Sequence, residues 1–386
     1  MNKAILPKVA KPIRYEVKLD IDLSNFKYTG SQDVELEIIK ETKSFEVNAI
    51  DIEIISTLLF NEDGKEFDLT FEYLEDLERI SFTASENIPV GNYSLQLEFN
   101  STITNDLKGF YKSQFLDLND NEKWIATTQF EPTSARNAFP CWDEPEYKAV
   151  FSISLTSDEK YLRVSNEKVL RENKLKDGRV ETLFVDSMKM STYLVAFVIG
   201  ELEVTEVGSV GDTQIRIIHR PGFSHQTSFA GTAGMKILEF FENYYQIPYP
   251  GSKLDLIAIP DFAMGAMENV GAVTFRESLL LIDESKATRQ ELSRSVSVIA
   301  HELAHMWFGD LVTMKWWDGI WLNEAFASLM EAIAANGTYP EFDQWSEMNL
   351  SRSAGFGVDS LKNSRPVEFE VETPEQAEEM FDVLTY

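Results

Sequence analysis

Residues 288–310 read TRQELSRSVSVIAHELAHMWFGD, and this stretch predicts one helix that carries two histidines. Thr288 with Glu291 three positions later is a capping box, a pattern typical of a helix start. Apolar residues then recur at helical spacing, at Leu292, Val296, Ile299 and Leu303. Because His301 and His305 are four positions apart, both imidazoles would project from the same side of the helix. The stretch therefore predicts a helix that can present two nitrogen ligands to one ion.

A carboxylate on the next predicted helix, at residues 322–335, completes a ligand set. Glu324 lies there, and two imidazoles with one carboxylate leave the fourth position of a zinc ion open, as in catalytic sites. Imidazole and carboxylate are both ligands that suit zinc. We therefore expect His301, His305 and Glu324 to bind one Zn²⁺ ion. The alternative is a helix in which two histidines share a face by chance.

Glu302 lies between the two histidines but off their common axis, so it is free to act as a general base. A water molecule bound to zinc has a much lowered pKa and can attack a carbonyl, with Glu302 accepting its proton. Two further carboxylates, Glu331 and Asp310, are candidates for orienting a ligand imidazole. A solvated surface position is an equal alternative for both of them.

The composition describes an acidic globular protein, and its 386 residues are enough for two or three domains. The chain has 35 Lys+Arg against 64 Asp+Glu, and the net charge of −29 argues against nucleic acid and anionic membranes as partners. The single cysteine, Cys141, excludes an intramolecular disulfide and fits a reducing compartment. Neither a signal peptide nor a membrane span is predicted, so we expect a cytoplasmic protein.

The expected fold class is α+β, with a β domain at residues 1–200 and a mixed domain at residues 201–386. In the first half, apolar and polar residues alternate as in a sheet with one buried face. One such run would bury Ile13, Tyr15, Val17, Leu19, Ile21 and Leu23. Turn signals at residues 61–64 and 176–178 separate the strands, and we predict an antiparallel arrangement.

The spacing of apolar residues becomes helical after Gly200. A helix face is predicted by Phe229, Ala233, Ile237 and Phe241, and the prolines at 248 and 250 would end this helix. Residues 254–259 and 271–275 predict short strands. From Asp343 onward the sequence is mixed and acidic, and no regular element is predicted there.

Several motifs together resemble one known family. The stretches HELAHMWFGD at 301–310 and WLNEAFA at 321–327 are similar to those of the gluzincin aminopeptidases of the M1 family. GAMEN at 265–269 matches the exopeptidase motif of that family, and residues 129–131 and 135–145 match its N-terminal signature. The puromycin-sensitive and archaeal tricorn-interacting types look most similar.

This resemblance implies a saddle-shaped N-terminal β-sandwich followed by a thermolysin-like catalytic domain that is incomplete at its C-terminal end. The resemblance also implies substrate-binding roles. Glu268 would bind the free α-amine of a peptide, and Glu131 would be a second carboxylate at the amine, although Pro132 departs from the usual small residue of the family. The remaining substrate-binding positions implied are Gln129, Met264, Gly265, Ala266, Met267 and Asn269.

Tyr386 fits the family context of a tyrosine that donates a hydrogen bond to the oxyanion, because Phe381 and Asp382 precede it at the usual spacing. Tyr386 is also the last residue of the sequence, and chain ends are often poorly ordered. The chain resembles the first half of a longer enzyme, whose missing C-terminal domains or a complementary chain would be partners.

The leading hypothesis is a zinc aminopeptidase that releases single residues from peptides with a free N-terminus. One alternative is an endopeptidase or an epoxide-hydrolysing relative, against which the amine-binding carboxylates argue. Another alternative is a truncated fragment that binds zinc and peptide without efficient turnover. The preferred first residue, the oligomeric state and the physiological substrate are not predicted.

Overall fold

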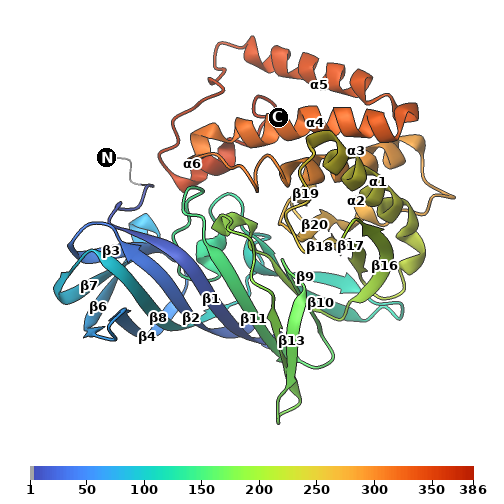
Figure 1. The fold of residues 1–386 in the computed structure, drawn as a ribbon. Helices are drawn as coiled ribbons and strands as arrows, with labels where there is room; N and C mark the ends of the chain where they lie inside the picture. Colours follow the sequence, from blue (N-terminus) through green and yellow to red (C-terminus); the bar gives the residue numbers. More distant parts are fainter. Residues whose placement is uncertain (1–3) are drawn as a thin grey trace. The chain divides into compact units, whose positions relative to one another are not determined.

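A computed structural model describes residues 4–386 of the chain (Figure 1). Contacts within the chain divide it into two compact units. The first unit contains the residues up to Ser113 together with Trp124–Glu201, and the second contains Gln114–Lys123 and Leu202–Tyr386. Residues 114–123 belong to the second unit, where the Gln114 N–H donates to the Asp261 carboxylate at 2.8 Å.

An eight-stranded sheet is the main element of the first unit, with the order β13-β14-β11-β1-β2-β8-β4-β5. Its strands are β1 (Ala10–Asp22), β2 (Lys27–Ile38), β4 (Glu53–Asn61), β5 (Glu66–Phe67), β8 (Gly91–Thr102), β11 (Val150–Asp158), β13 (Val169–Lys174) and β14 (Arg179–Phe184). Figure 1 shows β1, β2, β8 and β4 side by side, as their pairing requires. The alternating sequence gives alternating burial along β1 and β2, as predicted for a half-buried sheet.

The sheet is antiparallel as predicted, except at one pair of strands. Strands β1 and β11 run parallel, with Tyr15 opposite Phe151 and Leu19 opposite Leu155. Short-range periodicity specifies which face of a strand is buried, but not the direction of a neighbour that lies far away in sequence.

Ile13 also departs from the predicted pattern of burial. It was predicted to be buried with the other apolar residues of β1, but 39% of it is exposed. The register of β1 against β2 shifts between Pro12 and Arg14, which is the effect of a β-bulge. The extra residue turns Ile13 outward, and the regular alternation resumes at Tyr15, which is buried.

Two smaller sheets contribute to this half of the chain. One has the order β12-β15-β10-β9 and contains β9 (Gly109–Leu116), β10 (Glu122–Gln129), β12 (Leu162–Ser165) and β15 (Phe197–Gly200). The other contains β3 (Thr42–Asn48), β6 (Leu69–Leu74) and β7 (Arg79–Ile88). Buried Arg136, in the signature at 135–145, joins the loops of the first unit by bonds to Asp143 at 2.9 Å and to Glu78 at 2.8 Å.

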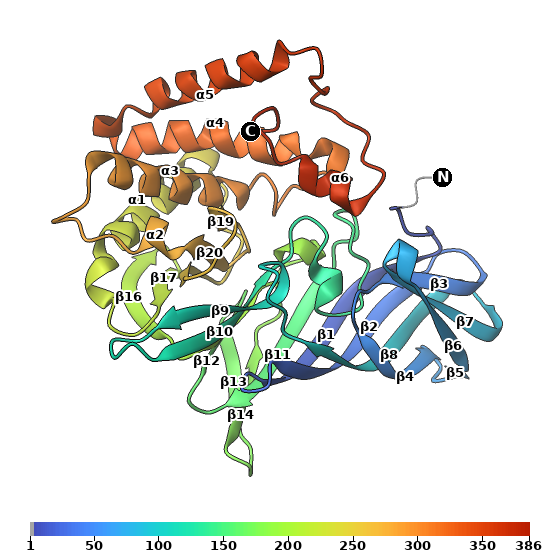
Figure 2. The same cartoon turned by 180° about the vertical axis from the view of Figure 1, so that it is seen from behind.

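The second unit combines a five-stranded sheet with helices. The sheet has the order β16-β17-β18-β20-β19, formed by β16 (Glu203–Val210), β17 (Thr213–His219), β18 (Lys253–Ile259), β19 (Ala266–Met267) and β20 (Ala272–Arg276). Its helices are α1 (Ser228–Tyr245), α2 (Glu277–Leu280), α3 (Arg289–His305), α4 (Trp321–Thr338), α5 (Gln344–Asp359) and α6 (Pro374–Glu379). Figure 2 shows α3 and α4 lying along each other, and their side chains share one apolar core with the sheet.

The predicted helices of this unit are present. The capping box of α3 forms in both directions: the Glu291 N–H donates to Thr288 Oγ1 at 3.2 Å, and the Thr288 N–H donates to Glu291 Oε2 at 2.7 Å. α4 continues to Thr338, three residues beyond the predicted end at residue 335. Helix α5 was not predicted, because its apolar residues Trp345, Leu350 and Phe356 are exposed and do not follow a buried stripe.

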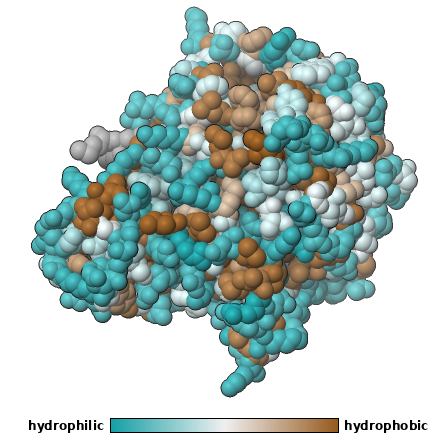
Figure 3. All heavy atoms as spheres, viewed as in Figure 1, coloured by the Kyte–Doolittle hydropathy of each residue, from teal (hydrophilic) through white to brown (hydrophobic). Residues whose placement is uncertain are grey.

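Hydrophilic side chains cover most of the face shown in Figure 3, with separate apolar areas between them. This agrees with the strongly acidic composition. In the part of the chain that the structure describes, the helices are too short or too polar to span a lipid bilayer.

Candidate active site

The last two turns of α3 present two imidazoles, those of His301 and His305, next to the first turn of α4, which carries Glu324. The rotation of α3 about its axis is set by apolar residues in the core, namely Val296, Ile299 and Leu303. His305, Glu302 and Glu324 are almost completely buried, and His301 is 12% exposed. Burial removes competing water from these four polar groups and strengthens their interactions.

Three donor atoms converge between the two helices. The Nε2 atoms of His301 and His305 are 3.1 Å apart, and Glu324 Oε2 lies 3.1 Å from the first and 3.5 Å from the second. Ligand bonds of about 2.0–2.1 Å in a tetrahedral zinc site place neighbouring ligand atoms about 3.3 Å apart. The three atoms therefore have the separations that one small divalent cation requires.

The remaining nitrogen of each imidazole has an acceptor of its own. His301 Nδ1 lies 3.2 Å from Glu331 Oε2, and Glu331 also accepts a hydrogen bond from the hydroxyl of Ser297. His305 Nδ1 lies 3.0 Å from the carbonyl oxygen of Phe308. A proton on each Nδ1 leaves the Nε2 lone pairs free to face the ion, which is the usual role of such partners.

These contacts distinguish between Glu331 and Asp310, the two carboxylates that were candidates for orienting an imidazole. Glu331 contacts His301 as predicted. Asp310, the other candidate, is buried and not solvated, the acceptor at His305 Nδ1 is the Phe308 carbonyl, and the backbone N–H of Asp310 donates to the carbonyl of His305 at 3.0 Å. A backbone acceptor has no sequence signature, which is why the prediction did not find it.

Gly309 permits the turn that places Phe308 against His305. Its φ angle is +141°, a conformation that residues with a side chain rarely adopt. A Cβ atom at this position would lie 3.1 Å from His305 Nδ1. A larger residue at 309 would therefore displace the imidazole as well as strain the backbone.

The electrostatics of the site favour a cation. Burial opposes a charge on Glu324, but His305 and His301 outweigh it and lower the pKa of Glu324 to about 2. Burial raises the pKa of Glu302 to about 8, with the two imidazoles acting in the opposite direction. Burial would also lower the pKa of each imidazole, yet the surrounding carboxylates raise the pKa of His301 well above its usual range and that of His305 to about 10. The residues present thus fit a divalent metal ion, which would compete with protons for the Nε2 atoms.

A fourth carboxylate, Glu268, lies beside the histidines. It follows the short strand β19, and its Oε1 atom is 3.9 Å from His305 Nδ1. Glu268 is only 3% exposed, and its Oε1 has no hydrogen-bond partner among the residues that the structure describes. Burial raises the pKa of Glu268, and His305 opposes this effect. A buried carboxylate oxygen without a donor is suited to receive one from a bound cationic group.

The loop that carries Glu268 is held by hydrogen bonds from several sides. The guanidinium of Arg276 donates to the carbonyls of Phe262 at 3.2 Å and Ala263 at 2.6 Å. At the other end of the loop, Lys253 Nζ donates to the Gly271 carbonyl at 2.6 Å. These anchors come from the sheet and bond to backbone carbonyls of the loop, and the Asn269 side chain adds a bond to Thr274 at 3.3 Å.

Tyr386 lies near the histidines although it is the last residue. Its ring centroid is 5.8 Å from that of His301, and the residue is 48% exposed. The preceding residues are packed into the second unit, since Thr385, Met380 and Val371 are buried. The terminal segment is therefore well anchored, in contrast to the expectation for a chain end.

Comparison with known families agrees with these features. The Peptidase M1 N-terminal domain model matches residues 11–194, and the Peptidase family M1 domain model matches residues 229–386. The chain belongs to peptidase family M1.

Curated M1 relatives are similar along the whole chain. The puromycin-sensitive aminopeptidase of Caenorhabditis elegans is 39% identical over 384 residues, which cover 99% of this chain and 40% of that protein. Aminopeptidase M1-A of Oryza sativa subsp. japonica is 39% identical, with 100% and 44% covered, and endoplasmic reticulum aminopeptidase 2 of Homo sapiens is 38% identical, with 99% and 40% covered. The chain thus spans less than half the length of the M1 relatives it matches.

The substrate-binding positions implied by the M1 resemblance fall into two groups. Gln129 ends β10 in the first unit, and Glu131 follows it before a cis bond to Pro132. The second group surrounds Glu268 in the second unit and consists of Met264, Gly265, Ala266, Met267 and Asn269. Met264 is 40% exposed, whereas Met267 and Asn269 are buried. Of these three side chains, Met264 therefore has the largest accessible surface.

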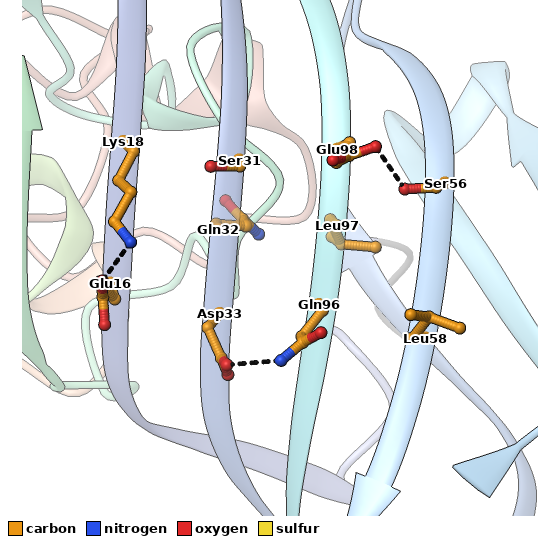
Figure 4. Close-up of a pocket in the computed structure, with 10 residues that line it drawn as sticks. All are labelled: Glu16, Lys18, Ser31, Gln32, Asp33, Ser56, Leu58, Gln96, Leu97 and Glu98. Carbon is orange, nitrogen blue, oxygen red and sulfur yellow. Dashed lines mark hydrogen bonds and ion pairs between the residues drawn. The ribbon is translucent and has the colours of Figure 1, made fainter. Parts of the chain in front are cut away.

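The M1 chain also has a groove of about 480 Å³ on its eight-stranded sheet (Figure 4). Polar side chains in the groove bond to each other: Lys18 pairs with Glu16 at 2.6 Å, and Gln96 donates to Asp33 at 3.0 Å. These residues are the outward-facing members of β1, β2 and β8. The groove is an ordinary solvated sheet face, and no function is assigned to it.

Proposed function

We propose that this chain contains the active-site residues of a zinc aminopeptidase, an enzyme that hydrolyses the first peptide bond of a peptide. The observation that carries the proposal is the convergence of His301 Nε2, His305 Nε2 and Glu324 Oε2 at separations of 3.1–3.5 Å. Membership of the M1 family and the names of the relatives support an aminopeptidase in particular.

His301, His305 and Glu324 would hold the zinc ion, which when bound lowers the pKa of a water molecule and polarises the peptide carbonyl. Glu302 accepts the proton of the attacking water and returns it to the leaving nitrogen. A carboxyl group whose pKa is raised to about 8 can hold a proton near neutral pH, as this transfer requires. Tyr386 donates a hydrogen bond to the oxygen that becomes negative during the reaction.

Glu268 binds the protonated α-amine of the substrate. A charge-assisted hydrogen bond to a buried carboxylate is stronger than one between neutral groups, so a free N-terminus would be preferred over a blocked one. The amine then lies a set distance from the reacting carbonyl, which limits cleavage to the first bond. We assign Glu131 to the same amine and Gln129 and Met264 to the first side chain on the basis of the family resemblance.

The test compares the hydrolysis of an aminoacyl anilide with that of the same anilide acetylated at its amine, using protein loaded with one equivalent of zinc. We expect cleavage of the free amine substrate and little cleavage of the acetylated one. Glu268→Gln should lower kcat/KM for the free amine by roughly tenfold or more and leave the acetylated substrate unchanged. Equal cleavage of both substrates by the wild-type chain would contradict the proposal.

A second candidate is a zinc- and peptide-binding chain without efficient turnover. The observation that favours it is that the matched relatives are more than twice as long as this chain. The same assay separates the two functions. Stoichiometric zinc binding with no hydrolysis of either anilide would support the second candidate and exclude the first for this chain.

A further inference from the structure

The guanidinium of Arg365 makes hydrogen bonds to several of the residues that precede Tyr386. Its Nη2 donates to Asp382 Oδ1 at 2.6 Å, and its Nε donates to Asp382 Oδ2 at 3.1 Å. The same Nη2 lies 2.6 Å from the hydroxyl oxygen of Thr385 and 3.1 Å from the carbonyl oxygen of Met380. Arg365 is only 17% exposed, so water competes weakly with these contacts.

The turn that Arg365 holds is also bonded internally. The N–H of Thr385 donates to the carbonyl of Asp382 at 3.0 Å, and the N–H of Leu384 donates to the Asp382 carboxylate at 2.9 Å. The hydroxyl of Thr385 donates to the carbonyl of Met380 at 2.5 Å. Thr385 is completely buried, so the residue adjacent to Tyr386 is fixed through both its backbone and its side chain.

Tyr386 itself is only partly enclosed. Nearly half of it is exposed, yet its ring lies 5.8 Å from the imidazole of His301. The position of the Tyr386 backbone limits where its side chain can lie, and a site residue needs such support from its neighbours. That backbone is joined directly to Thr385, which Arg365 contacts.

We infer that Arg365 is a positioning residue that holds Tyr386 beside His301 through Asp382 and Thr385. The inference rests on the proposed function, in which Tyr386 donates to the developing oxyanion. Arginine is suited to this task because its planar group makes two parallel bonds to a carboxylate and still reaches a third acceptor. Lysine at 365 retains the charge but can hold fewer of these acceptors at once.

The first test measures the position of Tyr386 without any catalytic assay. A carboxypeptidase releases the terminal tyrosine of the 386-residue chain, and the mass of the product is followed over time. Arg365→Gln should accelerate this release by roughly tenfold, because release follows the population in which the terminal turn is open. Arg352→Gln, at an exposed arginine of α5, is the matched control and should leave the rate unchanged.

A second variant tests the same contacts in case Arg365→Gln does not fold. Thr385→Val removes the hydroxyl that Arg365 and Met380 share and should also accelerate release, though by less than Arg365→Gln. Zinc binding with one equivalent per chain verifies that each variant is folded. If the carboxypeptidase releases Tyr386 from Arg365→Gln and Thr385→Val at the wild-type rate, the inference is wrong.

The second test is a double-mutant cycle with Tyr386→Phe, using kcat and KM for the aminoacyl anilide. Arg365→Gln alone should lower kcat by roughly tenfold with little change in KM, and should add less than about twofold when Tyr386 is already phenylalanine. Arg365→Lys should recover part of kcat. Additive losses would show that Arg365 does not act through Tyr386. If the wild-type chain is inactive, the proposed function fails for this chain, and the carboxypeptidase test decides the positioning separately.

Discussion

At the scale of single residues, two buried carboxylates that interact with the same imidazoles have pKa values shifted in opposite directions. The two imidazoles lower the pKa of Glu324 to about 2, whereas burial raises the pKa of Glu302 to about 8. A permanently ionised carboxylate suits a metal ligand, and one that gains and loses a proton near neutral pH suits a general base. The environment thus gives chemically identical side chains the different pKa values that the proposed roles of ligand and base require.

Substitution of Glu302, the proposed general base, should strongly lower turnover but leave metal binding intact. We expect Glu302→Gln to lower kcat by roughly 10²- to 10⁴-fold, the usual contribution of a general base. Zinc content should remain one equivalent per chain, because Glu302 is not one of the three converging donors. Zinc content and anilide hydrolysis are measured on the same preparation, and a variant that loses its zinc would contradict the assignment.

The acceptor of His301 should affect metal affinity. Glu331→Gln weakens the contact at Nδ1 and should raise the dissociation constant for zinc by roughly 10- to 100-fold, as is typical for partners of ligand histidines. Competition with a chelator of known affinity measures this change. Glu347→Gln, at an exposed glutamate of α5, is the control, and an equal effect of both substitutions would argue for a general charge effect instead.

At the scale of elements, His301 and His305 lie on a helix that begins at a sequence-encoded cap. The Thr288 side chain and Glu291 satisfy each other's backbone groups at the start of α3. Thr288→Ala should lower the free energy of unfolding by about 1 kcal/mol, the typical value for the loss of such a cap. Urea denaturation measures this value, and Thr70→Ala on the exposed side of β6 provides a comparison that should change stability less.

Elements that obey local patterns were predicted, and elements that depend on distant partners were not. α1, α3 and α4 follow apolar spacings of three and four residues, and each is present in the structure. The bulge at Ile13 and the parallel pairing of β1 with β11 depend on how the neighbouring strands are aligned. The sequence of a single strand does not specify how its neighbours are aligned with it.

At the scale of the whole molecule, one buried carboxyl group should make stability depend on pH. Burial raises the pKa of Glu144 to about 7 from a usual value of 4.5. Its Oε1 accepts the Leu6 N–H, but its buried Oε2 has no hydrogen-bond partner among the residues that the structure describes. The folded chain therefore holds this proton more tightly than the unfolded chain does.

The sign of the effect follows from that difference. Glu144 contributes most to stability below the unfolded pKa, and this contribution is lost as the pH rises through about 7. The loss amounts to at most about 3 kcal/mol. Glu144→Gln, which is neutral at every pH, should be more stable than wild type at about pH 8 and similar at about pH 4. Urea denaturation at several pH values tests this, with Glu35→Gln as an exposed control, and identical pH profiles for wild type and Glu144→Gln would refute it.

The sequence by itself determined the helix that carries His301 and His305, the position of Glu324 on the next helix and the motif around Glu268. These features depend on spacings within one element, and a periodic backbone converts such spacings directly into shared faces. The tertiary structure alone decided that the Phe308 carbonyl contacts His305, that Arg276 holds the loop of Glu268, and that Arg365 gathers the turn before Tyr386. The contacts of Arg276 and Arg365 join residues 13 or more positions apart, so they exist only once the chain has folded back on itself, and the contact of His305 with Phe308 depends on the turn that follows α3.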